Sequence, residues 1–177
     1  MSKLSLKDLL FICFCAVLLI AVRAAFRWRL GISGHAMFFT VFFLLLSRSC
    51  VSHRLTATLT GFFAGTAAIA LGMGKGGPLS LLNFLFPALA IDLGAFLFPP
   101  LLGSYPLCAL VGAFAGASKF FSAAAIGLLI GMDRTVLWQR AFIEAGAAMA
   151  FGCLGALCLP PVVKRLRAYG LFNPSGE

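Results

Sequence analysis

The chain has 177 residues, of which 62% are hydrophobic and only 11% are charged, and its mean hydropathy is +1.05. Soluble domains carry roughly 25% charged residues, and a small domain buries only about 70% of the surface of its unfolded chain, so the composition predicts an integral membrane protein. The net charge of +9 comes from short Lys and Arg clusters between apolar runs, which suits lipid headgroups and disfavours nucleic acid as a partner.

The apolar runs predict an all-α polytopic membrane protein, with residues 1–177 forming one integral membrane domain. A bilayer core of about 30 Å needs about 20 helical residues, a length that most of these runs reach. We therefore expect a bundle of six transmembrane helices. The predicted spans cover approximately 9–25, 35–47, 55–73, 79–98, 106–132 and 141–163.

The first span, 9–25, has the composition of a secretory signal peptide as well as that of a permanent helix. Arg23, Arg27 and Arg29 lie at its end, and translocation disfavours positive charge after an apolar run. We therefore expect a permanent span. The basic cluster near the C-terminus favours a bacterial inner membrane topology with both termini in the cytoplasm.

Small residues recur four positions apart in the third, fifth and sixth spans. This spacing places them on one helix face, where two backbones can approach closely. We expect most of these pairs to pack within the bundle and one smooth face to remain for a partner. The pairs are Gly61 with Gly65, Gly112 with Gly116, Gly127 with Gly131, and Ala148 with Gly152.

The fourth span, 79–98, carries two polar side chains, Asn83 and Asp92, with Pro87 between them. A proline inside a helix removes one backbone hydrogen bond and bends the helix, which leaves a carbonyl free for a ligand or a neighbouring helix. This span is therefore a candidate wall of a polar pocket.

The fifth span contains Lys119, the only charged side chain between Asp92 and Asp133. A charge at the centre of a bilayer costs at least about 2.5 to 3.5 kcal/mol, so Asp92 and Lys119 need partners or water. There are three alternatives. The two side chains pair with each other, or Asp92 lies near a helix end while Lys119 reaches the membrane interface, or both line a pocket and contact a ligand. We expect one long tilted helix here; the alternative is a break between 116 and 119.

Aromatic side chains flank these polar positions. Phe84, Phe86 and Phe120 could stack on a flat ligand, although core packing is the better explanation for each of them. The sequence has no ATPase or hydrolase motif and no cysteine or histidine spacing typical of a metal site. We therefore expect no enzyme activity, no cofactor and no bound metal.

Three segments carry a resemblance to a known family. The run LVGAFAGASKFFSAAAIGLLIGM (110–132), the run AFIEAGAAMAFGCLGALCLPPVVKRLR (141–167) and the segment GGPLSLLNFLFPALAIDLGAFLF (76–98) together resemble the later helices of substrate-binding S components of energy-coupling factor transporters. The length and the six predicted spans agree with that family.

The resemblance implies a subunit that binds a vitamin or similar micronutrient and works with a separate transmembrane coupling subunit and two ATPase subunits. Ala21 and Ala25 match the spacing of the AxxxA pattern that meets the coupling subunit in that family. Asn83, Asp92 and Lys119 would be the polar groups of a substrate pocket, closed by the loops after the first and third spans. A membrane scaffold or a stand-alone carrier of small solutes remains as an alternative function.

Overall fold

The computed structural model describes residues 5–27, 34–51, 53–73, 77–97 and 105–168, and the regular structure of these ranges is entirely helical. The all-α prediction is therefore confirmed. The elements are α1 (Leu6–Arg27), α2 (His35–Cys50), α3 (Thr56–Ala70), the short 3-10 helix η1 (Gly77–Leu81), α4 (Leu82–Leu97), α5 (Tyr105–Ala117), α6 (Lys119–Ile130), α7 (Arg134–Leu157) and α8 (Leu159–Ala168).

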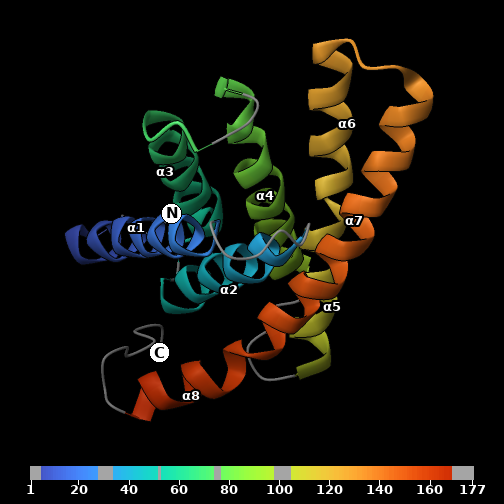
Figure 1. Cartoon of the computed structure of the whole chain (residues 1–177). Coiled ribbons are helices and arrows are strands. Elements are labelled where there is room, and N and C mark those ends of the chain that lie inside the picture. Colours follow the sequence, from blue (N-terminus) through green and yellow to red (C-terminus); the bar gives the residue numbers. More distant parts are fainter. Residues whose placement is uncertain (1–4, 28–33, 52, 74–76, 98–104, 169–177) are drawn as a thin grey trace.

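The long helix α7 organises one side of the molecule, because it packs against α5, α2 and α6. On the other side, α3 packs against α4 and α1 (Figure 1). Figure 1 shows α6 and the adjoining part of α7 forming a hairpin beside α4, while α8 continues from the far end of α7. The main apolar core lies where α2, α4, α5 and α7 meet, and it includes Leu44, Ile91, Val111 and Ala148.

Four stretches of the described residues are long and apolar enough to cross a membrane, which is compatible with a membrane location. They are Leu6–Ala25, Gly77–Leu97, Tyr105–Ile130 and Arg134–Leu166. The apolar helices α2 and α3 have 16 and 15 residues, which is less than the roughly 20 that a bilayer core requires. The arrangement of six spans stays a prediction.

The fifth and sixth predicted spans are each divided into two helices, in place of the single tilted helix that we favoured for 106–132. The first break is at Ser118, where the backbone N–H still bonds to the carbonyl of Phe114 at 3.0 Å and Oγ donates a hydrogen bond to the carbonyl of Ala115 at 2.7 Å. The second is at Cys158, just before Pro160 and Pro161, which have no backbone N–H to continue the ladder.

Most of the recurrent small residues pack inside the bundle, as the spacing predicted, whereas Gly131 is exposed at the C-cap of α6. A Cβ atom added at Gly112 would lie 2.5 Å from the carbonyl oxygen of Gly152, and one at Gly61 would lie 2.7 Å from the Cβ of Ala88. These distances are too short for any side chain. The glycines of α5 and α3 therefore allow direct backbone contact with α7 and α4.

Candidate functional site

Polar side chains inside the bundle form two groups at opposite ends of α4. Asn83 lies in the first turn of this helix and Asp92 lies nine residues later. At about 1.5 Å rise per residue, they are about 13 Å apart along the helix axis. The structure therefore does not bring the three predicted ligand-binding side chains together in one place.

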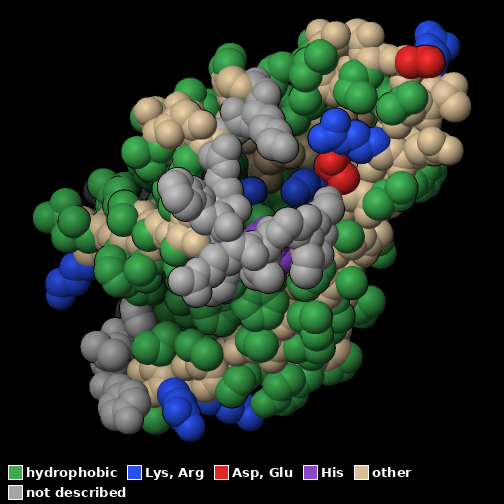
Figure 2. Space-filling view, viewed as in Figure 1, with side chains coloured by type: hydrophobic (Ala, Val, Ile, Leu, Met, Phe, Trp, Pro, Cys, Tyr) green, Lys and Arg blue, Asp and Glu red, His purple; other side chains and the backbone are tan. Residues whose placement is uncertain are grey.

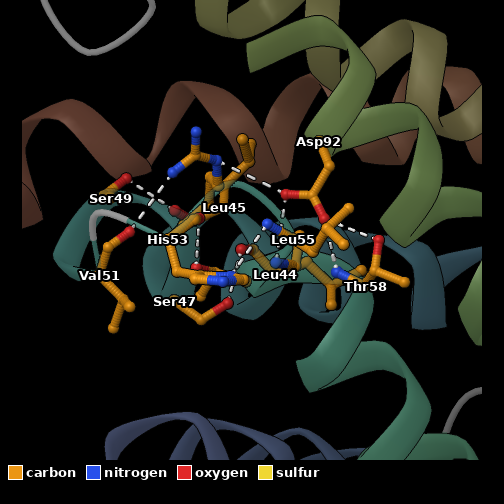
Figure 3. Close-up of polar contacts among 12 residues, drawn as sticks. Leu44, Leu45, Ser47, Ser49, Val51, His53, Leu55, Thr58 and Asp92 are labelled. Carbon is orange, nitrogen blue, oxygen red and sulfur yellow. Dashed lines mark hydrogen bonds and ion pairs between the residues drawn. The ribbon is translucent and has the colours of Figure 1, made fainter. Parts of the chain in front are cut away.

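The group around Asp92 is a structural cap on α3, and we call it the α3 cap (Figure 3). One carboxylate oxygen, Oδ2, accepts hydrogen bonds from the Thr58 backbone N–H at 2.8 Å and the Thr58 hydroxyl at 2.7 Å. The other, Oδ1, accepts one from the N–H of Ala57 at 3.2 Å and lies 3.5 Å from Nε of Arg48. The residue at the N-cap position itself, Leu55, has no polar side chain, so a carboxylate from α4 satisfies the free N–H groups.

The α3 cap joins the end of α2, the start of α3 and the last third of α4. The Asp92 side chain is only 6% exposed and that of Arg48 is 21% exposed, so the ion pair is largely removed from solvent. Of the alternatives left open by the sequence, Asp92 pairs with Arg48 and not with Lys119. A contact between Asp92 and a ligand stays a prediction.

The second group contains Arg23, Lys119, Arg140 and Glu144, and we call it the cation group. Arg23 lies on the inner face of α1, where its guanidinium carbon is 4.5 Å from the centroid of the Phe84 ring. Its Nη1 atom also lies 3.5 Å from the hydroxyl of Thr40 in α2.

Sequence reasoning placed Arg23 among the charges at the end of the first span and missed this inward position. The signal that could have found it is helical periodicity. Ile12, Cys15, Ala16, Leu19 and Ile20 are the buried positions of α1. The same 3.6-residue period continues to Arg23 because α1 extends to Arg27.

Lys119 is the first residue of α6, and its electrostatic neighbours are the guanidinium of Arg23 and the carboxylate of Glu144. The Glu144 carboxylate serves two cations, because its Oε1 atom accepts a hydrogen bond from Nε of Arg140 at 2.8 Å in addition to its electrostatic effect on Lys119. The described side chains of the cation group are therefore three cations and one carboxylate. Such a group carries an excess of positive charge.

A cavity of about 260 Å³ adjoins the cation group between η1, α4, α6 and α7. Figure 2 shows Lys and Arg side chains recessed in a hollow on this face, next to an acidic side chain. Asn83 connects the cavity with α6, because its Oδ1 accepts a hydrogen bond at 3.2 Å from the hydroxyl of Ser122, which also bonds to the carbonyl of Lys119. The residues that line the cavity are Ser80, Asn83, Ala123, Ile126, Gly127, Ile130, Met132, Leu137, Arg140, Ala141 and Glu144.

No family model, curated protein or solved structure matches this chain. The site is therefore interpreted from its own residues. Asn83 and Lys119 belong to one polar region, while Asp92 belongs to the other.

The remaining predicted site residues have separate positions. Phe84 is buried against Arg23, and Phe86 is half-buried in α4. Phe120 packs instead in the hairpin of α6 and α7, where its ring centroid is 5.6 Å from that of Trp138 and 5.1 Å from that of Phe142.

The predicted partner interface and the predicted closing loops lie elsewhere on the chain. Ala21 and Ala25 are exposed on α1. Most of the two loops that we expected to close the pocket, 28–33 and 74–76, lies outside the described residues.

Proposed function

We propose that this protein is the membrane-embedded subunit of an uptake system and that the region of the cation group binds a small organic anion, such as a vitamin that carries a carboxylate or phosphate. The observation that carries the proposal is the position of Arg23 and Lys119, two cations that influence each other inside a bundle of apolar helices, in a group whose other members, Arg140 and Glu144, line a cavity. Small-molecule sites are mostly apolar with a few convergent polar groups, and this region has that character.

Charge balance favours an anionic ligand at this group. Two like charges held near each other in a poorly solvated place raise the free energy of the empty site, and only one carboxylate of the group, Glu144, offsets them. A ligand with one or two negative charges relieves the repulsion when it binds. The same cations disfavour binding of a metal cation.

The proposal includes partners, in line with the resemblance of the sequence to S components. A separate transmembrane coupling subunit and two ATPase subunits would supply the energy for release into the cytoplasm. Ala21 and Ala25 are exposed on α1 and are therefore accessible to a coupling subunit. The protein would lie in the bacterial inner membrane with its termini in the cytoplasm.

The test is thermal unfolding of the full chain in detergent with pantothenate, biotin, nicotinate or pyridoxine 5′-phosphate. A ligand at 100 times its Kd stabilises the folded state by about 2.7 kcal/mol, which raises Tm measurably. We expect at least one of these acids to raise Tm, and its neutral relative, such as nicotinamide or pyridoxine, to have a smaller effect. Lys119→Met should abolish the shift.

The matched control is Phe114→Leu, a change at an exposed apolar position of α5 that leaves the charges unchanged. Equal losses in Lys119→Met and Phe114→Leu would contradict the assignment of Lys119. Uptake of the stabilising acid into vesicles that lack any ATPase would indicate a stand-alone carrier. The absence of any stabilisation, together with stable co-purification with an unrelated enzyme, would favour the scaffold.

A further inference from the structure

We infer that the site has two parts: Arg23 and Lys119 hold the anionic group of a ligand, and the adjoining cavity receives an uncharged part of the same molecule that forms hydrogen bonds. This inference rests on the proposed function and specifies its substrate. The substrate class is a small organic acid, a carboxylate or a phosphate ester, that also carries hydroxyl, amide or ring-nitrogen groups.

The first observation is the hydroxyl of Ser80 in η1. The side chain is only 5% exposed, and its Oγ atom has no hydrogen-bond partner among the residues that the structure describes. Buried polar groups are nearly always hydrogen-bonded in native proteins, so an orphaned hydroxyl needs an explanation. Ser80 lines the cavity, where a bound molecule would supply the missing partner.

The second observation is the neighbouring amide of Asn83. Its Oδ1 atom lies 3.2 Å from the hydroxyl of Ser122, whose single proton is shared with the carbonyl of Lys119 at 2.9 Å, so the amide N–H groups of Asn83 stay available as donors. Ser80 and Asn83 line the same cavity. Together they offer a hydroxyl, which donates or accepts, and an amide, which donates.

The rest of the cavity wall is largely apolar. Its other residues are Ala123, Ile126, Gly127, Ile130, Met132, Leu137 and Ala141, together with the mutually paired Arg140 and Glu144. A volume of about 260 Å³ is just below the about 300 Å³ at the lower end of typical ligand pockets. An aromatic ring or short chain with polar groups fits this description better than a nucleotide or a peptide.

The two parts of the site are linked through α4 and α6. Phe84, which carries the guanidinium of Arg23 on its ring, directly follows Asn83. The hydroxyl of Ser122 bonds to both Asn83 and the carbonyl of Lys119. Asn83, which lines the cavity, is therefore joined by short links to the positions that carry both cations.

The test compares two pairs of anions. Nicotinate and benzoate differ only in the ring nitrogen, and pyridoxine 5′-phosphate differs from benzyl phosphate mainly in its ring nitrogen and two hydroxyl groups. Affinities are obtained from Tm titrations of the full chain in detergent. We expect the polar member of at least one pair to bind about threefold to tenfold more tightly, which corresponds to one net hydrogen bond. The pair that shows this preference identifies the anion as a phosphate or a carboxylate.

Ser80→Ala should remove the preference and leave the Tm of the unliganded protein unchanged or slightly higher, because the hydroxyl has no protein partner to lose. The matched control is Ser49→Ala near the C-terminal end of α2. The hydroxyl of Ser49 donates a hydrogen bond to the carbonyl of Leu45 at 2.6 Å. This control should keep the preference.

Two results would overturn the inference and leave the proposed function intact. One is a preference that survives in Ser80→Ala while all binding is lost in Lys119→Met. The other is a lower Tm of unliganded Ser80→Ala, because the hydroxyl would then have a structural partner. If neither these four anions nor pantothenate nor biotin binds the wild-type protein, both the inference and the proposed function are wrong.

Discussion

The α3 cap gives the sharpest prediction of stability, because one side chain carries most of its contacts. Asp92→Ala removes the acceptor of three hydrogen bonds, at 2.7, 2.8 and 3.2 Å, and the carboxylate partner of Arg48. The loss of a helix cap alone costs about 1 kcal/mol. Removal of one member of a buried ion pair costs about 3 to 5 kcal/mol.

The cost of about 3 to 5 kcal/mol for breaking a buried ion pair is an upper bound for Asp92→Ala. The Arg48 side chain keeps 21% of its exposure, and its Nη1 atom also donates to the carbonyl of Val51 at 3.3 Å. We therefore expect Asp92→Ala to lower the free energy of unfolding by about 3 kcal/mol. With about 2 to 4 °C per kcal/mol for a chain of this size, Tm should fall by about 6 to 12 °C.

The buried cysteines of the protein can report the free energy of unfolding. Cys15 and Cys108 are buried cysteines, so a fluorogenic maleimide reaches their side chains only after unfolding. Asp92→Asn keeps an acceptor for Thr58 and should cost less than Asp92→Ala. A double-mutant cycle with Arg48→Met should give a coupling of about 0.5 to 3 kcal/mol.

The control is Asp133→Ala, since Asp133 is exposed at the N-cap of α7 and its side chain forms no cap hydrogen bond. That change should lower Tm by less than about 2 °C. Equal shifts in Asp92→Ala and Asp133→Ala would refute the structural role of the α3 cap.

The remaining predictions concern the packing of α7. Gly116→Ala would place a Cβ atom 2.6 Å from Cα of Met149, so the helices must separate and the free energy of unfolding should fall by about 1 to 3 kcal/mol. Gly146→Ala is the control, because a Cβ atom there meets open space, and it should raise the free energy of unfolding by up to about 1 kcal/mol. Thermal unfolding measures both variants. Equal shifts in Tm would contradict the close approach of α5 and α7. Phe120→Ala removes the ring contacts with Trp138 and Phe142 and should lower the free energy of unfolding by about 1 to 3 kcal/mol. It should also change the fluorescence of Trp138, whereas the exposed control Phe114→Leu should not.

Local sequence determined where the helices lie and which residues let them touch. An apolar run of about 20 residues has to be helical in lipid because every backbone N–H and C=O needs a partner within the segment. Each of the six predicted spans accordingly contains at least one helix. Glycines four residues apart indicated close contacts such as that of Gly112 with Gly152 for the same local reason, since they share one helix face.

Two helix breaks show how far local signals extend. Pro160 and Pro161 mark the end of α7 in the sequence, because neither can donate a backbone hydrogen bond. The break at Ser118 has no comparable signal, because a serine whose hydroxyl bonds to the carbonyl three residues earlier also occurs within an uninterrupted helix, as Ser47 does in α2. The sequence offered both forms of the fifth span, and the fold decided between them.

The partners of the buried charges were decided only by the tertiary structure. The sequence showed that Asp92 and Lys119 need partners, because an isolated charge in an apolar bundle is unfavourable. It did not show that Asp92 meets Arg48 and the start of α3, or that the charges nearest in effect to Lys119 are those of Arg23 and Glu144. These contacts join helices far apart in the chain, and they depend on how each helix is rotated and crosses its neighbours, which no local pattern of residues specifies.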